Sequence, residues 1–323
     1  MDQHTIPNCY LKAWCDPAPL PPKHTPFIWL IQKDDRTGSK KRKKAPRNAF
    51  TESDRYTIRR NDGGKIFTIE QGLAATEDAF VRLRPKIEAR EALTPQDRLK
   101  LFEFATAMFA RSKAQGDHFA QFFRTVNRQV KNLEKKRGAK PGLSLETRLH
   151  SENGPASTVA MFMLSWPFLF MRMNMTILCT EADEGFITSD CPFVMVNPDS
   201  YKLPPGLRYP APGRDPKIEI TLPLSPRRLL LISHVYPSGY ADVPQQVVDE
   251  LNSRTRFGCA QHFVSQKGVV KDFWFIAAKL PDDSWENSPE GIAAEEFRRR
   301  DLKAKADWEA YAKLGGDQGS SSN

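Results

Sequence analysis

The apolar stretch TVAMFMLSWPFLFMRMNMTILC, residues 158–179, constrains the fold of this chain more than any other feature. Such a run forms either a membrane-spanning helix or part of a protein core. Pro167, Arg172 and Asn174 interrupt it, and the uninterrupted part of about 13 residues is too short for a membrane span. We therefore expect a core helix that ends near Arg172, a strand over residues 173–180, and no membrane partner.

Apolar residues spaced by three and four predict a helix from Ile69 to Ile87. The next helix has a clear start signal, because Thr94 is a good N-cap, Pro95 suits the first helical position and Asp97 favours the first turn. A third helix is expected over residues 117–136, ended by the glycines of residues 138–142.

The second half of the chain favours strands, bounded by Pro, Gly or Asp, with one helix over residues 244–260. Further strands are expected in PFIWLIQKDD, in QHFVSQ and in DFWFIAAKL. The sequence thus predicts an α+β class, with a mixed β-sheet built from N-terminal and C-terminal strands and a helical segment in the middle. We expect a single domain over residues 1–285 (helical over about 67–172, strand-rich over about 173–280). A charged helix and a disordered tail would follow over residues 286–323.

The chain carries 48 Lys and Arg against 39 Asp and Glu, a formal net charge of +9. This excess favours anionic partners such as nucleic acid or nucleotides. Much of it lies in short runs at residues 40–44, 135–137 and 298–300, which are also typical of exposed loops and helix ends. The five cysteines form no CxxC pair, and the N-terminus lacks signal-peptide regions, so we expect a reducing, cytoplasmic location.

The opening segment, MDQHTIPNCYLKAW, is amphipathic rather than merely polar. Ile6, Tyr10, Leu11 and Trp14 can bury one face of a short helix and so hold His4 at a defined place. His4 titrates near neutral pH and is a candidate general acid or base. It could equally be hydrogen-bonded to a neighbouring carbonyl.

Two acidic residues lie on one helix face, two turns apart. Glu70 is in the first turn, where it favours the helix dipole, whereas Glu77 sits beside the apolar stripe and is either partnered or functional. Arg111 follows a very apolar helical face. Three roles are open to it: capping the helix, pairing with a carboxylate such as Glu77, or binding a phosphate.

The stretch FITSDCP places polar groups at the end of a strand, a common position for active-site residues. Asp190 could bind a metal or orient His4. The alternative is an Asx turn, in which Asp190 or Ser189 bonds nearby backbone amides. Asn252 is a weaker candidate, and His234 and His262, in or beside strands, favour ordinary structural roles. No GxSxG, HExxH, Walker or GxGxxG motif is present.

These residues together resemble the bacterial domain-of-unknown-function family 4238 (DUF4238). The similarity runs in order from Gln3 to about Gln266, and its specific parts are the opening QHTIPNCYLKAW and the TSDxP motif. Residue by residue, the resemblance points to Gln3, His4, Pro7, Glu77, Arg111, Thr188, Ser189, Asp190, Pro192 and Asn252. Trp14 and Cys191 depart from the usual phenylalanine and the frequent asparagine. The family has no settled activity, so the resemblance implies a site more than a function.

The leading hypothesis is a hydrolase, nuclease- or phosphodiesterase-like, that acts on nucleic acid or a nucleotide, such as a toxin or phage-defence effector. Its catalytic residues would be His4, Glu77 and Asp190, its substrate-binding residues would be Gln3, Arg111, Ser189 and Asn252, and its cofactor, if any, a divalent metal ion. The alternative is a non-catalytic protein that binds nucleic acid or protein. In that case the same residues form a structural polar network.

Overall fold

The computed structural model describes residues 2–19, 23–59, 64–138, 142–205, 208, 215–276 and 282–316. It divides the chain into two compact units. The first unit comprises Met1–Met195 and Ala211–Ile276, and the second comprises Val196–Pro210 and Ala277–Asn323. The predicted α+β class is confirmed. The predicted domain boundary at residue 285 stays a prediction.

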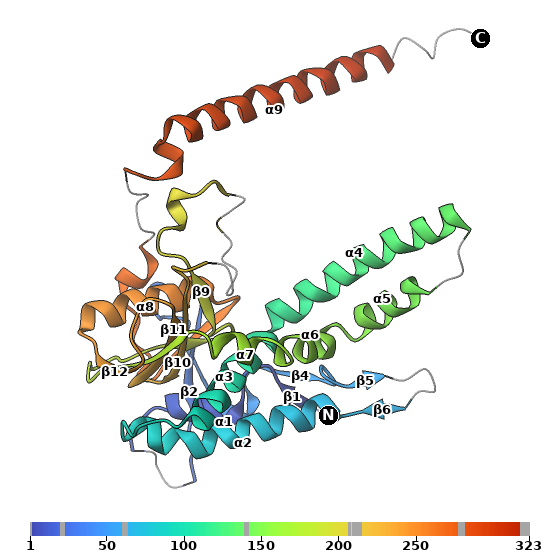
Figure 1. The fold of residues 1–323 in the computed structure, drawn as a ribbon. Coiled ribbons are helices and arrows are strands. Elements are labelled where there is room, and N and C mark those ends of the chain that lie inside the picture. The colour runs from blue at the N-terminus through green and yellow to red at the C-terminus, as the bar shows by residue number, and fades with distance from the viewer. Residues whose placement is uncertain are drawn as a thin grey trace. The chain divides into compact units, whose positions relative to one another are not determined.

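The helices of the first unit, labelled in Figure 1, are α1 (Asn8–Leu11), α2 (Thr68–Glu88), α3 (Pro95–Ala110), α4 (Lys113–Arg137), α5 (Leu143–Glu152), α6 (Gly154–Met163), α7 (Trp166–Phe170) and α8 (Gln245–Gly258). The expected start of α3 is confirmed, because Thr94 and Asp97 form a reciprocal capping box. Gly138 ends α4 with a left-handed φ of 60°, a conformation that glycine adopts without strain.

The single core helix expected to end near Arg172 is wrong. The helix α6 ends at Met163, and α7 begins at Trp166. Pro167 explains the break, because it has no backbone N–H and is tolerated only in the first turn of a helix. The strand expected after Arg172 is confirmed as β7 (Asn174–Cys179).

The five-stranded sheet has the order β12 (Gly239–Asp242), β7, β11 (Arg228–Ser233), β10 (Glu219–Ser225) and β9 (Val194–Val196). The four-stranded sheet has the order β3 (Arg42–Lys44), β2 (Ile28–Gln32), β13 (His262–Ser265) and β8 (Thr188–Ser189). Two further pairs join β1 (Asp2–His4) to β4 (Thr51–Ser53), and β5 (Ile58–Arg59) to β6 (Lys65–Ile66). Strands from the two ends of the chain meet as predicted, because β2 pairs with β13.

Two local expectations are wrong. The segment Asp272–Phe275, expected to be part of a strand, forms a short 3-10 helix, and residues 277–281 lie outside the described residues. The basic run at residues 40–44, expected to be an exposed loop, instead forms the edge strand β3 in its second half.

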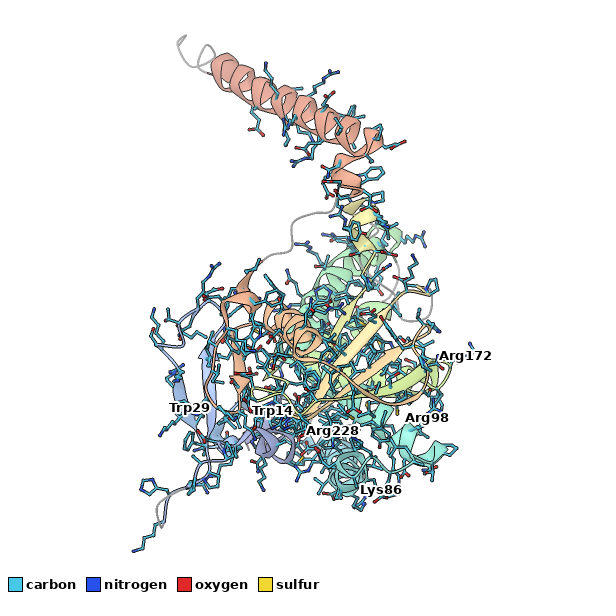
Figure 2. The ribbon with its side chains drawn as sticks, turned by 90° about the vertical axis from the view of Figure 1, so that its left-hand side faces the viewer. Trp14, Trp29, Lys86, Arg98, Arg172 and Arg228 are labelled. Carbon is cyan, nitrogen blue, oxygen red and sulfur yellow. The ribbon has the colours of Figure 1, made fainter. Side chains whose placement is uncertain are left out.

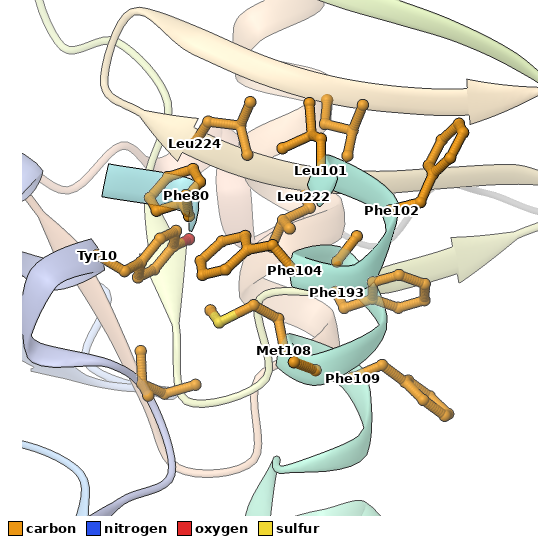
Figure 3. Close-up of a cluster of buried hydrophobic side chains, with 14 of the residues drawn as sticks. Tyr10, Phe80, Leu101, Phe102, Phe104, Met108, Phe109, Phe193, Leu222 and Leu224 are labelled. Carbon is orange, nitrogen blue, oxygen red and sulfur yellow. The ribbon is translucent and has the colours of Figure 1, made fainter. Parts of the chain in front are cut away.

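The main core surrounds α3, whose Phe102, Phe104, Met108 and Phe109 project in several directions (Figure 3). Phe104 stacks on Phe80 of α2 with ring centroids 3.8 Å apart. The opening segment docks into this core as predicted, since Ile6, Tyr10, Leu11 and Trp14 have no exposed surface. On the opposite face of the five-stranded sheet, α8 packs through Val248 and Leu251.

The second unit contains α9 (Pro289–Gly316), which corresponds to the charged helix expected there. Its charges form pairs one turn apart, such as Asp301 with Lys305 at 2.8 Å. Within the described ranges, no helix of either unit combines the length and the apolar character that a membrane crossing requires.

Candidate functional site

Gln3 lies in β1, which pairs with β4, and its side chain is fully buried. Its Oε1 accepts a hydrogen bond from the Tyr56 backbone N–H at 2.6 Å, and its Nε2 donates to Thr57 Oγ1 at 3.3 Å. The oxygen and the nitrogen of the Gln3 amide therefore both bond the segment that contains Tyr56 and Thr57. This arrangement fixes the N-terminal strand against its neighbours.

Arg111 immediately follows α3 and is 2% exposed. Its Nη1 donates to Glu77 Oε1 at 2.6 Å. Its Nε donates to the His4 carbonyl oxygen at 3.1 Å, and its Nη2 donates to the same oxygen. The Arg111 carbonyl in turn accepts from the Tyr56 hydroxyl at 2.7 Å. Of the three roles open to Arg111, the structure shows two: Arg111 is the C-cap residue of α3, and its side chain pairs with Glu77.

The His4 ring is half-buried, and its Nε2 lies 3.1 Å from the Arg47 carbonyl oxygen. Burial lowers the pKa of His4. A neutral ring with the proton on Nε2 donates to that carbonyl. The nearby Cys9 thiol donates to Glu77 Oε2 at 3.6 Å, and burial raises the pKa of this thiol to about 12. We call Gln3, His4, Tyr56, Glu77 and Arg111 the N-terminal network.

Asp190 anchors backbone amides. Its two carboxylate oxygens accept hydrogen bonds from the backbone N–H groups of Ala260, Gln261 and His262 at 2.7, 2.7 and 2.9 Å. Ser189 Oγ accepts from the Cys191 N–H at 3.1 Å. Asp190 thereby ties the turn after β8 to the start of β13.

Asn252 of α8 is buried and bridges two backbone groups of the segment before β8. Its Oδ1 accepts from the Ile187 N–H at 2.9 Å, and its Nδ2 donates to the Gly185 carbonyl at 2.9 Å. Its amide thus holds the approach to β8 against α8.

The predicted site residues thus fall into separate groups. Gln3, His4, Glu77 and Arg111 are joined in the N-terminal network, whereas Ser189 and Asp190 lie beside the start of β13, and Asn252 contacts the chain before β8. Among the described residues, no hydrogen bond or ion pair joins His4 to Asp190. The predicted catalytic and substrate-binding roles stay predictions.

Asp190 also lines a hollow of about 470 Å³, which we call the β3 pocket. Its polar lining includes Arg42, Lys44, Glu52, Lys113, Asp117, Asp190, Cys191, Gln261 and His262. Strand alternation explains which cations face it. Arg42 is the register partner of Leu30, and His262 and Val264 are those of Gln32 and Leu30, so these side chains share one sheet face.

Lys43 lies on the other face of β3, and Lys41, just before the strand, contacts the same Trp29 ring. The Lys41 and Lys43 ammonium groups lie 4.9 and 5.1 Å from the ring centre of Trp29, which Figure 2 shows beside the blue N-terminal strands. One basic run therefore contributes to two surfaces, with Arg42 and Lys44 at the β3 pocket and Lys41 and Lys43 on aromatic rings.

The β3 pocket is lined by three cations, Arg42, Lys44 and Lys113, and by three carboxylates, Glu52, Asp117 and Asp190. Lys113 is paired with Glu52 at 3.1 Å and Asp117 at 3.0 Å. In the part of the chain that the structure describes, neither Arg42 nor Lys44 forms an ion pair. Lys113 is also the first residue of α4, so the positive end of that helix dipole faces the hollow. Two of the three cations in the lining, Arg42 and Lys44, therefore have no carboxylate partner among the described residues.

His262 lines this pocket, and its Nε2 is buried and has no hydrogen-bond partner among the described residues. Its predicted structural role stays a prediction. Burial lowers the pKa of His262, the Asp190 charge raises it and the Arg42 charge lowers it. Burial, followed by the Asp190 charge, raises the pKa of the neighbouring Cys191 thiol to about 11, so the thiol is protonated and a weak nucleophile. Within the described ranges, no group of three or more His, Cys, Asp or Glu residues could hold a metal ion.

Sequence reasoning missed Arg42, Lys44 and His262 as pocket residues. The signal for the two cations was the alternation within KKRKK, which becomes informative only once that run is assigned to a strand. His262 carried no comparable signal, because one histidine beside a strand fits many structures.

The fold and pocket define an α+β protein with a polar hollow, lined by cations and carboxylates, between β3 and the end of β8. The chain belongs to the family described as protein of unknown function (DUF4238), whose model matches residues 2–268. The resemblance seen in the sequence is thereby confirmed. No curated protein and no solved structure matches the chain.

Proposed function

We propose that the protein binds the phosphate groups of a nucleic acid or nucleotide in the β3 pocket. The observation that carries the proposal is the presence of two cations, Arg42 and Lys44, that line the hollow and have no carboxylate partner in the described part of the chain. The N-terminus of α4 adds backbone N–H groups and a favourable dipole at the same place. The pocket volume of about 470 Å³ lies within the range of small-molecule sites.

The N-terminal network supports the binding interpretation over catalysis by its own residues. Arg111 already donates to Glu77 and to the His4 carbonyl, so its donors are engaged within the protein. Asp190 is similarly engaged with three backbone amides. In this proposal Arg111 and Asp190 stabilise the surrounding structure and do not contact the ligand.

Hydrolysis of a phosphodiester is the second candidate function, and His262 is the observation that favours it. A neutral imidazole can accept a proton, and two nearby cations can stabilise phosphate charge. These groups are the least that acid–base hydrolysis without a metal requires. In the wider hydrolase proposal, His4, Glu77 and Asp190 are catalytic and a divalent metal assists. A cytoplasmic toxin or phage-defence effector would use either chemistry.

The first prediction uses the two faces of β3 as matched controls. The double substitution Arg42→Gln/Lys44→Gln is expected to weaken binding of fluorescein-labelled RNA and DNA oligonucleotides or of a labelled nucleotide by about 10–30-fold, since two phosphate-facing charges are lost. Fluorescence anisotropy at several salt concentrations measures this, and the salt dependence of binding should become shallower.

The control, Lys41→Gln/Lys43→Gln, removes the same charge from the two residues of the same basic run that contact Trp29. It is expected to change affinity less than about threefold, because diffuse charge alone contributes little at physiological salt. Equal losses of affinity in both double variants would contradict binding in the β3 pocket and would indicate non-specific electrostatic attraction. RNA or DNA cleavage that is abolished by His262→Gln but retained in His234→Gln would establish the hydrolase instead.

A second prediction concerns pH. Burial holds the pKa of free His262 below its usual value, and a bound phosphate would raise it by favouring the charged ring. Binding therefore takes up a proton, and affinity should rise by about 3–10-fold as pH falls from about 7.5 to 5.5. Anisotropy titrations at each pH test this; a His262→Gln variant with the same pH dependence would exclude His262 as its source.

A further inference from the structure

The strand β12 forms one edge of the five-stranded sheet. It pairs with β7 in parallel along one side, and within the described residues no strand pairs with its other side. Figure 1 shows β12 at the border of the sheet, below α8. An open edge presents backbone N–H and C=O groups to an additional strand.

Two hollows flank this edge on opposite faces of the sheet. The α8 pocket, about 440 Å³, includes Leu178, Leu231 and Val247 in its lining. The α3 pocket, about 350 Å³, includes Ile177 and Arg98. Because Ile177 and Leu178 are consecutive in β7, their side chains point to opposite faces. Ser238, Gly239 and Tyr240 line both hollows, so the edge runs between them.

Side-chain size keeps the α8 pocket open at the edge. Gly239 and Ala241 are the register partners of Thr176 and Leu178, whose side chains face α8. Neither residue can fill the hollow beside them. The polar groups at the rim are already paired, because Arg254 contacts Glu219 at 2.5 Å and Glu250 at 2.6 Å. An apolar side chain is therefore the best complement to this pocket.

The α3 pocket contains a hydrogen-bond donor, Arg98, that would pair with an acceptor. The guanidinium of Arg98 forms no hydrogen bond or ion pair among the described residues, and its Nε is buried. Its neighbour Arg90 is compensated by a paired contact with Asp242. In Figure 2, Arg98 lies between Lys86 and Arg172 on the same side of the molecule. A carboxylate in this hollow would satisfy a donor that the chain leaves unpartnered.

We propose that β12 accepts an extended segment of a partner protein as an additional strand, with apolar side chains in the α8 pocket and alternating acidic side chains beside Arg98. Such strand addition takes affinity from backbone hydrogen bonds and specificity from alternate side-chain pockets. The observation is independent of the β3 pocket and of the proposed function.

The test uses a fluorescein-labelled, end-capped hexapeptide with phenylalanine and leucine at its second and fourth positions, glutamate at its third and fifth, and threonine at both ends. We expect saturable binding to the full chain in anisotropy titrations. Arg98→Gln should weaken it about tenfold, as for loss of one charge-assisted hydrogen bond. Tyr240→Pro should abolish it by removing an edge N–H, because the N–H groups of Ala241 and Val243 point toward β7 and that of Tyr240 points to the open side.

Three controls complete the experiment. Lysine in place of both glutamates, or N-methylation of alternate peptide amides, should each abolish binding, whereas Arg42→Gln/Lys44→Gln should leave it unchanged. If Tyr240→Pro fails to fold, Ala241→Leu, which fills the α8 pocket, takes its place. Equal binding of the N-methylated peptide would overturn the proposal. It would also be overturned by a wild-type dimer that dissociates in Tyr240→Pro or Ala241→Leu, since a second copy would then occupy the edge.

Discussion

Arg111→Met is expected to lower the free energy of unfolding by about 3–5 kcal/mol. The substitution leaves Glu77 without its 2.6 Å cationic partner and removes the donors that hold the His4 carbonyl. Because Arg111 is 2% exposed, water cannot replace these contacts without rearrangement of the core. Urea unfolding followed by circular dichroism measures the change.

Arg124→Met is the matched control, since Arg124 is exposed on α4 and bonds only the Ala120 carbonyl through its side chain. A change below about 0.5 kcal/mol is expected there. If Arg111→Met instead keeps full stability and loses phosphate binding, the guanidinium acts on the ligand. The substrate-binding role proposed for Arg111 would then replace the structural one.

Asp190→Ala should also cost about 3–5 kcal/mol of stability. Three backbone N–H groups, of Ala260, Gln261 and His262, would lose a charged acceptor at the start of β13. Since β13 is central in the four-stranded sheet, the loss should affect global unfolding rather than a local loop. The free energy of unfolding of Asp190→Asn should lie between those of Asp190→Ala and the wild type, because an amide accepts fewer of the three hydrogen bonds.

Asp183→Ala is the control, because Asp183 is exposed in the preceding segment and is expected to show a change below about 0.5 kcal/mol. The informative alternative is an Asp190→Ala protein that unfolds like the wild type but no longer cleaves or binds its ligand. That outcome would assign Asp190 to chemistry, as the hydrolase hypothesis does.

Local signals predicted much of the fold because they act within a few residues. The Thr94–Asp97 capping box, the apolar spacing of α2 and the amphipathic opening segment each depend on neighbours along the chain, and each is confirmed. The helix break before Pro167 was not predicted. A proline in a long apolar run shows that the run is interrupted, but the sequence alone does not show that it occupies the first turn of a new helix.

The candidate site was less predictable, because its partners are remote in sequence. The pairing of Arg111 with Glu77 was one of three open alternatives, and nothing local distinguished it from a phosphate contact. His262 becomes noteworthy only through neighbours such as Asp190 and Arg42, which long loops and sheet pairing bring beside it.

Patterning along the chain was sufficient for the α+β class, the docked N-terminal segment and the family, since periodicity, caps and motifs are properties of short segments. The division of KKRKK between two surfaces required the pairing of β3 with β2, which decides which residues share a face. The vacant edge of β12 likewise exists only in the assembled sheet. Strand register and the pockets beside it are set by long-range contacts, and no local pattern encodes them.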